Sequence, residues 1–529
     1  MLHHIAKLPP LRTLLLSAAQ RRAERFLSRD PLAAQRRIFA DLLNSAAQTR
    51  FGRDHGFAEL TGLPFEKAYA RFSAQTPIRN YQDFWDDYFK DNLHQQADGQ
   101  KALRLKDATW PGRIGMFCET SGTTAPTKFI PFSERMFREN QSAALDMISC
   151  YLRQHPDSRI PGGKILYMSG STALTEMDPG VFSGDMSALT LRFRPWYVTG
   201  FVEPPLETAA LPWDQKLQAM AELLLRDRDI RAISGVPPWI ILLIRRCCEL
   251  SGLPADRALS HLELVIHGGT SIKPYRNEFD QLFRGQMPAL IELLPSSEAF
   301  MGFQCAGEPA MRLTPHYGTF FEFVRMEELD DNGRPGQFAT AVPLEQVQAG
   351  QRYALILSTC SGLWRYHIGD TVRFSSLAPH HMEFTGRDRF LDKLEEKVTQ
   401  EEVERAVATL NSSGLFAVRE FMVGADISGR RHVWVLAGAS RGADCTTEAA
   451  LLLDGQLRAL NADYDTFRSQ GRINPPDIKL VADDTIYQWS RQVRGKLGGQ
   501  SKIPHIDPTQ DCAMIASLAS FAGNCGVHV

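Results

Sequence analysis

The sequence lacks several features that mark secreted, zinc-binding or nucleic-acid-binding proteins. Its 529 residues carry a formal net charge of -2, which gives no reason to expect nucleic acid or an acidic membrane as a partner. Its nine cysteines are scattered and odd in number. They form no pair of CxxC elements, so neither a disulfide scaffold nor a structural zinc site is expected. We therefore expect a protein of the reducing cytoplasm. The sequence does not determine the oligomeric state, and we favour a monomer.

Long hydrophobic runs are also missing. The most apolar stretch near the N-terminus, Leu14 to Leu16, is bounded by Arg12 and Arg21. It is far shorter than the roughly 20 apolar residues of a transmembrane helix and is marginal as the core of a signal peptide. We expect an amphipathic first helix that packs on the body of the protein, and no membrane partner.

The composition is that of an ordinary globular protein, with 43% hydrophobic and 23% charged residues. From about residue 164, short apolar runs alternate with helical patterns. Strands are expected at 164–169, 262–267, 289–294 and 353–359, and helices at 213–225 and 275–283. This alternation predicts an α/β fold in which ligand-binding groups gather where strands run into loops.

The pattern changes after Phe384. A charged break at 386–389 is followed by Thr399 and Glu402, whose spacing predicts a capping box at the start of a helix. Two apolar runs separated by Ser-Gly-Arg then predict a hairpin. We expect a large domain over 1–386 and a smaller α+β domain over 387–529, with a hinge near 386–390.

The stretch SGTTAPTK, residues 121–128, combines small and hydroxyl-bearing residues with one cation. It is not a Walker loop, because the second glycine is absent and Phe follows the lysine. Gly122 lets a ligand approach the backbone, the hydroxyls of Ser121, Thr123 and Thr124 can donate to phosphate, and Lys128 adds positive charge. Taken alone it is equally compatible with a solvated turn. A nucleophilic Ser121 is disfavoured, because no GxSxG elbow surrounds it.

Further candidate residues stand in predicted loops and turns, and Glu298 follows the end of a predicted strand. The carboxylate of Glu298, in Ser296-Ser297-Glu298, can hold a magnesium ion, and Asp370 can accept ribose hydroxyls. Each could equally be a turn residue, and a loop lysine alone is usually a solvated charge. The remaining candidates are Gly268, Gly269, Thr270, Arg387, Lys397 and Lys502.

In this order, the elements resemble those of adenylate-forming enzymes, and more specifically the GH3 family of acyl-acid amido synthetases. The similarity spans about 51–506. Residues 120–131 resemble the family's first nucleotide motif, 295–298 its second, and 365–370 its YRxGD motif. Residues 384–402 resemble its hinge region, and 499–504 its C-terminal lysine loop.

This resemblance implies a large adenylate-forming domain of mixed sheets and helices, and a smaller mobile domain. It also implies an ATP- and Mg²⁺-dependent ligase that adenylates a carboxylic acid and transfers the acyl group to an amine, usually that of an amino acid. Glu298 would bind magnesium, and Lys502 would neutralise the α-phosphate. The implied nucleotide contacts are Ser121, Gly122, Thr123, Thr124, Lys128, Gly268, Gly269, Thr270, Ser296, Ser297, Asp370, Arg387 and Lys397.

The sequence departs from the family pattern at several positions. Leu294 stands where an aromatic residue is expected, Ala299 replaces a glycine, and 125–127 lack the usual glycine and basic residue. The C-terminal loop ends in Pro504-His505 where arginine is typical. Two alternatives stay open: a ligase that delivers the acyl group to a thiol, such as coenzyme A or a carrier protein, and a non-catalytic relative that binds a small acid or nucleotide.

Overall fold

The computed structural model describes residues 5–95, 101–120, 127–170, 173–330, 333–387, 390–440, 445–494 and 503–524, and all structural statements concern these residues. Their main feature is a twelve-stranded sheet with the order β15-β14-β16-β17-β18-β13-β12-β11-β10-β9-β5-β8. From β8 to β11 the neighbouring strands are parallel, and from β11 onward they are antiparallel. The bounds are β5 Lys164–Tyr167, β8 Val202–Glu203, β9 Ile230–Gly235, β10 Leu264–Gly268, β11 Ala289–Pro295, β12 Phe300–Gln304, β13 Met311–Leu313, β14 Thr319–Arg325, β15 Ala341–Pro343, β16 Arg352–Thr359, β17 Tyr366–Leu377 and β18 His380–Arg387.

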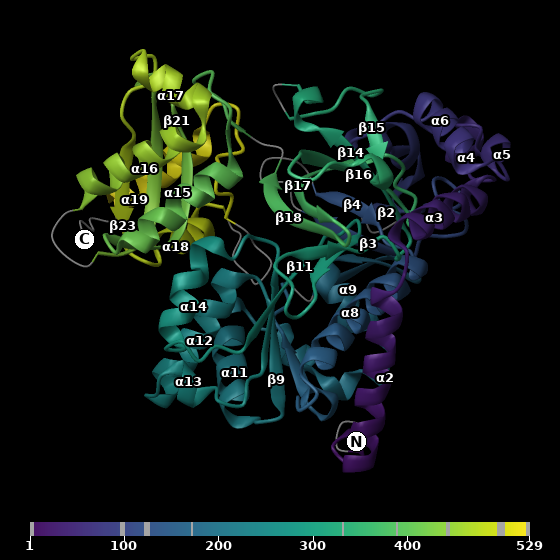
Figure 1. Ribbon diagram of the computed structural model, residues 1–529, viewed down its shortest axis with the longest axis horizontal. Coiled ribbons are helices and arrows are strands. Elements are labelled where there is room, and N and C mark those ends of the chain that lie inside the picture. The colour runs from purple at the N-terminus through teal and green to yellow at the C-terminus, as the bar shows by residue number, and fades with distance from the viewer. Residues whose placement is uncertain are drawn as a thin grey trace.

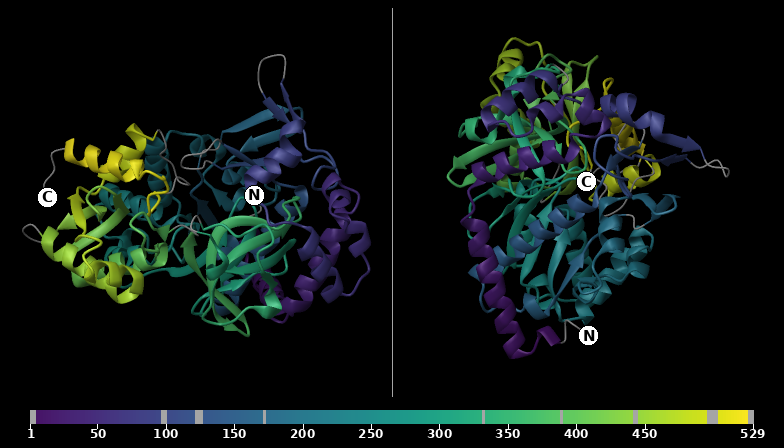
Figure 2. Two further views of the ribbon diagram at one scale, coloured as in Figure 1. Left: turned by 90° about the horizontal axis from the view of Figure 1, so that it is seen from above. Right: turned by 90° about the vertical axis from the view of Figure 1, so that its right-hand side faces the viewer.

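Helices build the N-terminal region. Helices α2 (Pro9–Leu27) and α3 (Pro31–Ala46) follow one another in this region, and the Asp30 carboxylate caps α3 by accepting from the Leu32 amide at 2.9 Å. Helix α2 packs along α8 (Glu134–Gln154) on the outside of the molecule (Figure 1; right-hand view of Figure 2). Shorter elements follow: α4 Arg50–Asp54, α5 Phe57–Leu60, α6 Phe65–Gln75, α7 Tyr81–Phe84, β1 Leu93–Gln95 and β2 Lys101–Leu103.

A second, four-stranded sheet has the order β4-β3-β7-β6. Its strands are β3 Met116–Thr120, β4 Lys128–Pro131, β6 Leu174–Asp178 and β7 Val181–Gly184, and α9 (Met186–Phe193) follows directly. The apolar core around Phe117 and Cys118 continues into that of β14 to β17. The predicted phosphate loop connects β3 to β4 and is therefore fixed at both ends.

Helices pack against the parallel part of the large sheet. Residues of α11 and α12, among them Met220 and Ile240, share one core with β9 and β10. The bounds are α10 Leu206–Ala209, α11 Trp213–Arg226, α12 Pro237–Ser251, α13 Ala255–Ala258 and α14 Arg276–Leu282. No helix among the described residues is long and apolar enough to cross a membrane.

Residues after β18 form a C-terminal body with its own apolar core, drawn in yellow-green in Figure 1. Strands β21 (Phe416–Asp426), β22 (Arg431–Ser440) and β23 (Asp477–Val481) make a sheet in which β21 and β22 form an antiparallel hairpin. The remaining elements are β19 Phe390–Leu391, β20 Val398–Thr399, α15 Gln400–Ser413, α16 Thr446–Leu460, α17 Ala462–Ser469, α18 Thr485–Gln492 and α19 Ala513–Asn524.

The C-terminal body touches the rest of the molecule at the turn that leads into α14 and along α12. The Tyr275 hydroxyl donates to Glu420 at 3.4 Å, and the Asn411 side chain donates to the Pro274 carbonyl at 2.8 Å. The rings of Trp239, in α12, and Tyr487, in α18, lie 5.1 Å apart between centroids. These contacts join the C-terminal body to α12 and to the turn before α14.

The elements predicted from periodicity are present with small shifts in their ends. The predicted strands correspond to β5, β10, β11 and β16, and the predicted helices to α11 and α14. The capping box is confirmed in both directions, because the Thr399 hydroxyl accepts from the Glu402 amide while the Glu402 carboxylate accepts from the Thr399 amide. The mixed α/β fold class is confirmed as well. The domain boundary at 386 stays a prediction.

Candidate functional site

The predicted phosphate loop sits in the β3–β4 hairpin, although Ser121, Gly122, Thr123 and Thr124 lie outside the described residues. Thr120 and Lys128 are cross-strand partners at its two ends, so the hairpin holds the ends together. The Lys128 ammonium lies 5.6 Å from the centroid of the Tyr81 ring, and the Tyr81 hydroxyl accepts from the Phe129 amide at 2.8 Å. The pairing with Thr120 and the contact with Tyr81 thus hold Lys128 at the point where the loop enters β4.

The glycine turn follows β10 and passes close to the neighbouring strand β11. A Cβ at Gly268 would lie 2.3 Å from the Leu293 carbonyl oxygen, and Gly269 has a φ of 85°, which favours glycine. The Thr270 hydroxyl is buried without a hydrogen-bond partner. Next to the end of β11, a ligand could therefore bind the Thr270 hydroxyl and approach the glycine backbone closely.

The residues after β11 form a tight turn that orients Glu298. The Ser296 hydroxyl accepts from the amides of Glu298 and Ala299, at 3.2 and 3.1 Å, so its local role is to shape the turn. Ser297 is half-buried, and Glu298 is 9% exposed. The sequence-based interpretation of these serines as nucleotide contacts is therefore retained as a prediction.

Glu298, Asp370 and Arg387 come together although they are far apart in the chain. Asp370 and Arg387 are partners in the β17–β18 register, and the Arg387 Nε lies 2.9 Å from the Asp370 Oδ1. Asp370 is 5% exposed. Burial raises the pKa of Glu298, the Arg387 charge opposes this, and the Asp370 charge adds to it. One guanidinium thus serves two buried carboxylates, which leaves room for a further cation.

Tyr366 is a member of this cluster that the sequence analysis missed. It is 2% exposed, and burial together with the neighbouring Glu298 carboxylate holds the pKa of Tyr366 well above its ordinary value. The Tyr366 hydroxyl therefore stays protonated beside Glu298. Its position next to Arg365 in the YRxGD-like stretch was the available signal.

Arg365 itself has a structural role. It is 1% exposed, has a φ of 44°, and pairs with the buried Glu322 at 3.1 Å. Its guanidinium also donates to the carbonyls of Ser73 and Thr76. Arg365 therefore links the start of β17 to β14 and to the end of α6. These links fix the part of β17 that carries Tyr366 and Asp370.

Two further titratable groups lie beside the glycine turn. His267, at the end of β10, is adjacent to Glu292 of β11 in the parallel register. Burial and the Arg276 charge lower the pKa of His267 to about 3, and its Nδ1 has no hydrogen-bond partner. Burial raises the pKa of Glu292 to about 7. Both side chains are therefore largely neutral near pH 6. The sequence analysis did not identify Glu292, because its neighbour His267 is 25 positions away in the chain.

The predicted nucleotide contacts of the C-terminal region are Lys397 and Lys502. Among the described residues, no hydrogen bond or ion pair joins Lys397 to the cluster of Glu298, Asp370 and Arg387. Lys397 is exposed just before β20, and its carbonyl accepts from the Asn461 side chain at 3.0 Å. Lys502 lies outside the described residues. The segment that follows it is anchored, because Ile506 forms a parallel bridge with Val423 of β21.

His505 holds that segment in place through two buried carboxylates. Its Nδ1 lies 2.9 Å from the Glu404 carboxylate, its Nε2 lies 3.5 Å from that of Glu420, and its ring stacks on Phe421 at 4.1 Å. Burial lowers the pKa of His505, but hydrogen bonds and charges from Glu404 and Glu420 outweigh burial and raise it to about 9. The imidazole is therefore charged at neutral pH.

Models of three consecutive GH3 domains match the chain: the N-terminal domain over 21–251, the central domain over 313–387 and the C-terminal domain over 397–510. These ranges cover more than half of the residues and include β3, β17 and α15. The chain belongs to the GH3 family. Glu298 lies between the first two matched ranges, whereas Asp370 and Arg387 lie in the central GH3 domain.

Curated GH3 relatives are similar over part of the chain. Indole-3-acetic acid-amido synthetase GH3.10 of Arabidopsis thaliana is 28% identical over 266 residues, which are 47% of this chain and 45% of the relative. Indole-3-acetic acid-amido synthetase GH3.8 of Oryza sativa subsp. indica is 29% identical over 54% of this chain and 49% of the relative. The chain thus spans about half the length of the curated relatives it matches.

Solved structures confirm the fold over nearly the whole length. The GH3.15 acyl acid amido synthetase superposes with a TM-score of 0.71 at 18% identity, covering 92% of this chain and 93% of that chain. A 2-hydroxyisobutyryl-CoA ligase in complex with 2-HIB-AMP superposes with a TM-score of 0.57 at 12% identity, covering 92% and 91%. The GH3 fold is therefore shared with another class of ligase.

Proposed function

We propose that this GH3 protein is an ATP-dependent ligase that adenylates a carboxylic acid and transfers the acyl group to an amine, most simply that of an amino acid. The supporting observation is that a chain with three GH3 domain matches assembles a polar cluster of Glu298, Asp370 and Arg387, of which Asp370 and Arg387 lie in the central GH3 domain. Buried titratable groups with shifted pKa values gather at functional sites more often than elsewhere.

The reaction has two steps with a balanced exchange of bonds. A carboxylate oxygen attacks the α-phosphorus of ATP, and pyrophosphate leaves. An amine nitrogen then attacks the acyl carbon of the adenylate, AMP leaves, and the nitrogen loses a proton. Both steps require reactants held in line and stabilisation of developing negative charge.

The site residues divide this work by position. Asp370, supported by Arg387, would accept the ribose hydroxyls, and the turn from Gly268 to Thr270 would border the adenine. The hydroxyls of the loop between β3 and β4, with Lys128 at its rim, would hold phosphates. We assign phosphate contacts to Ser121, Gly122, Thr123 and Thr124, and further nucleotide contacts to Ser296, Ser297 and Lys397.

Glu298 fits a magnesium site shared with substrate. Magnesium is usually held by one or two carboxylates together with phosphate oxygens and waters, so a full protein cage is not needed. No cluster of three or more metal-ligating side chains occurs among the described residues, so the proposal requires the substrate and water to supply the remaining ligands. The buried Glu298 carboxylate, whose pKa is raised, would be the protein ligand. The ion would supply charge neutralisation at the phosphates.

The C-terminal body would complete the site for the first step. We assign the small domain to 387–529 and the hinge to 386–390, so that Lys502 can approach the α-phosphate during adenylation and withdraw before amine transfer. The anchoring of 503–507 on β21 means that Lys502 would move with the body as one unit. We also propose a cytoplasmic monomer.

Exchange between ATP and labelled pyrophosphate tests the first step. Purified protein should catalyse this exchange when a suitable acid from a broad panel, including indole-3-acetic acid, is present with Mg²⁺. Exchange driven by any acid would exclude a purely binding relative. The absence of both exchange and ATP binding across the panel would overturn the ligase proposal.

Product analysis tests the acceptor. With an active acid identified, amino acids and coenzyme A are offered separately, and products are separated by mass spectrometry. An amide product supports the amido synthetase assignment. A thioester formed in place of an amide would transfer the assignment to a ligase with a thiol acceptor.

A further inference from the structure

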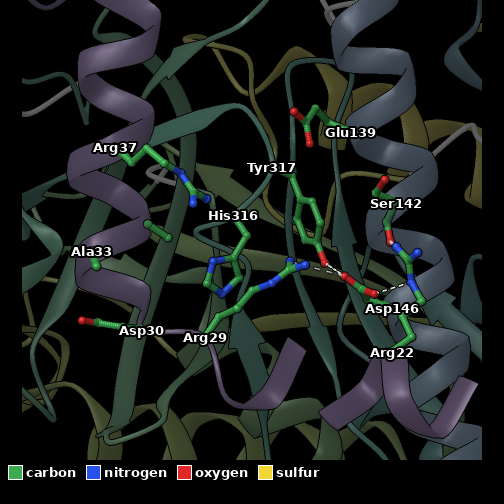
Figure 3. A pocket seen from close by; sticks show the side chains of 11 residues that line it. Arg22, Arg29, Asp30, Ala33, Arg37, Glu139, Ser142, Asp146, His316 and Tyr317 are labelled. Carbon is green, nitrogen blue, oxygen red and sulfur yellow. Dashed lines mark hydrogen bonds and ion pairs between the residues drawn. The ribbon is translucent and has the colours of Figure 1, made fainter. Parts of the chain in front are cut away.

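A cavity of about 560 Å³ lies between the bend from α2 to α3, helix α8 and the segment before β14 (Figure 3). None of its lining residues belongs to the candidate nucleotide site. Its polar lining includes Arg22, Arg29, Arg37, Asp146, His316 and Tyr317. Side chains from opposite walls point toward one another across it in Figure 3. The cavity is therefore a separate, polar feature of the molecule.

The carboxylate at the bottom of the cavity is already balanced. Asp146 is 1% exposed, accepts a hydrogen bond from the Tyr317 hydroxyl and forms an ion pair with Arg22 at 2.5 Å. The Arg22 guanidinium also donates to the Ser142 carbonyl at 3.1 Å. Asp146, Tyr317 and Arg22 thus form a closed group that gives this wall of the cavity a fixed shape.

The other acidic side chains at the cavity are also committed elsewhere. Asp30 caps α3 through the Leu32 amide. Glu139 lies 3.8 Å from the guanidinium of Arg135, which does not line the cavity. Burial raises the pKa of Glu139, which reduces its negative charge further. Asp30 keeps its negative charge, but the ion pairs of the cavity arginines among the described residues are with Asp146 and not with Asp30.

The positive charges of Arg29 and Arg37, which line the cavity, are less closely paired than that of Arg22. Arg29 reaches Asp146 only at 3.9 Å, beyond hydrogen-bond distance. The Arg37 guanidinium makes no hydrogen bond or ion pair with any residue that the structure describes. Arg37 comes from α3 and Arg29 from the bend before it. In Figure 3 the Arg37 side chain is directed toward His316, whereas the Arg29 side chain passes beside His316 and ends near Asp146. The two arginines thus enter the cavity on either side of His316.

His316 adds an unused polar atom between them. Its Nδ1 is buried without a hydrogen-bond partner. Burial and the charges of Arg29 and Arg37 lower the pKa of His316 to about 4, so the imidazole is neutral at pH 7 and can donate one hydrogen bond. Two guanidiniums and an unpaired ring nitrogen match the donors that oxyanions bind.

We propose that this cavity binds a small multivalent oxyanion, such as a phosphorylated or polycarboxylated compound, through Arg29, Arg37 and His316. The site is independent of the proposed ligase activity, because it shares no residue with the candidate nucleotide site. The anion would bridge the two arginines and accept a hydrogen bond from the imidazole, while Asp146 and Tyr317 keep the far wall in place.

Isothermal titration calorimetry on the full chain tests this site with inorganic phosphate, citrate and chloride at matched ionic strength. Saturable binding of phosphate or citrate, but not chloride, is expected with a dissociation constant of about 0.1 to 1 mM. Phosphate alone would identify a phosphoryl ligand, and citrate alone a polycarboxylate. No saturable binding of either anion would overturn the proposal.

Variants then locate the binding. The double variant Arg29→Gln/Arg37→Gln should bind the anion at least about tenfold more weakly, since charge-assisted hydrogen bonds are lost. The control is Arg21→Gln, an exposed arginine of α2 that does not line the cavity, and it should bind like the wild type. Equal affinity of the double variant and the wild type would place the anion elsewhere and overturn the proposal.

A second variant guards against loss of folding. His316→Phe keeps an aromatic ring against Phe26, whose ring centroid lies 5.8 Å away, but removes the ring nitrogen. Weaker anion binding with an unchanged thermal unfolding midpoint supports the assigned contact. Unchanged binding in His316→Phe would show that His316 does not contact the anion. Unchanged binding in both His316→Phe and Arg29→Gln/Arg37→Gln would overturn the proposed site.

Discussion

Two buried clusters of acidic groups in this protein balance their charge in different ways. Glu298 and Asp370 share the single guanidinium of Arg387, and the pKa of Glu298 is raised. Glu404 and Glu420 enclose the imidazolium of His505, and two tyrosine hydroxyls also donate to Glu420. Both clusters set two carboxylates against one cation. We call the second cluster balanced because its imidazolium lies within 3.5 Å of both carboxylates. In the first, Arg387 lies 2.9 Å from Asp370 and acts on Glu298 through its charge, so Glu298 is the unbalanced carboxylate and can still accept a cation.

Removing the unbalanced carboxylate should have the largest effect on activity. Glu298→Gln is expected to lower acid-dependent ATP–pyrophosphate exchange by at least about 100-fold, because stabilisation of transferring phosphate charge is lost. The unfolding midpoint should stay the same or rise, since a poorly compensated buried charge disappears.

The matched control is Glu176→Gln, an exposed carboxylate of β6, which should leave exchange unchanged. Exchange that is as fast in Glu298→Gln as in the control would contradict the assignment of Glu298.

Breaking the balanced cluster should instead reduce stability. His505→Gln leaves Glu404 and Glu420 buried without their cation, and we expect a loss of about 3 kcal/mol in the free energy of unfolding. Chemical denaturation measures this loss. The double variant His505→Gln/Glu404→Gln should recover part of it, since one uncompensated charge is gone. Strictly additive losses would show that the two side chains are not coupled.

The same cluster predicts a pH dependence. The pKa of His505 rises from 6.5 to about 9 on folding, so the folded state binds the proton more tightly. Its stabilising contribution is complete below pH 6.5 and is lost as the pH rises through about 9. Urea midpoints across this range should fall more steeply for the wild type than for His505→Gln. Parallel curves would rule out His505 as the titrating group.

A smaller effect is expected for the ribose contact. Asp370→Asn should weaken the apparent affinity for ATP by about tenfold, because hydrogen bonds to a charged acceptor become hydrogen bonds to a neutral one. Steady-state exchange at varied ATP concentrations separates this change in KM from a change in kcat. An effect on kcat alone would assign Asp370 a different role.

The smallest effect is expected for one of the two tyrosines that donate to Glu420. Tyr275→Phe removes one hydroxyl from Glu420, but the Tyr487 hydroxyl remains at 3.2 Å. A loss of about 1 kcal/mol or less in stability is expected, with unchanged exchange activity. A large loss of exchange would show that the structural cluster also acts in the reaction.

Local patterns predicted much of the fold. The alternation of apolar residues located β5, β10, β11 and β16, and the spacing of Thr399 and Glu402 located the start of α15, because these signals depend on neighbours in the chain. Glu298 was predicted as a polar residue beyond a strand end. Asp370 was expected after a glycine turn, but it lies inside β17, paired with Arg387 of β18.

Long-range partners could not be predicted in the same way. The pairing of Arg365 with Glu322 and the enclosure of His505 by Glu404 and Glu420 depend on how separate elements pack. His505 appeared only as a departure from a family pattern. Its compensating partners become visible once α15 and β21 lie side by side, because nothing in their local sequence refers to residue 505.

The contact between Trp239 and Tyr487 gives the molecule a built-in optical probe. The two rings lie 5.1 Å apart but belong to α12 and to the C-terminal body. The proposed rotation of that body is expected to separate the phenol of Tyr487 from the buried indole of Trp239 and so to change the tryptophan fluorescence. The proposed domain motion can thus be tested in the unlabelled protein, with Tyr487→Leu as the silent reference.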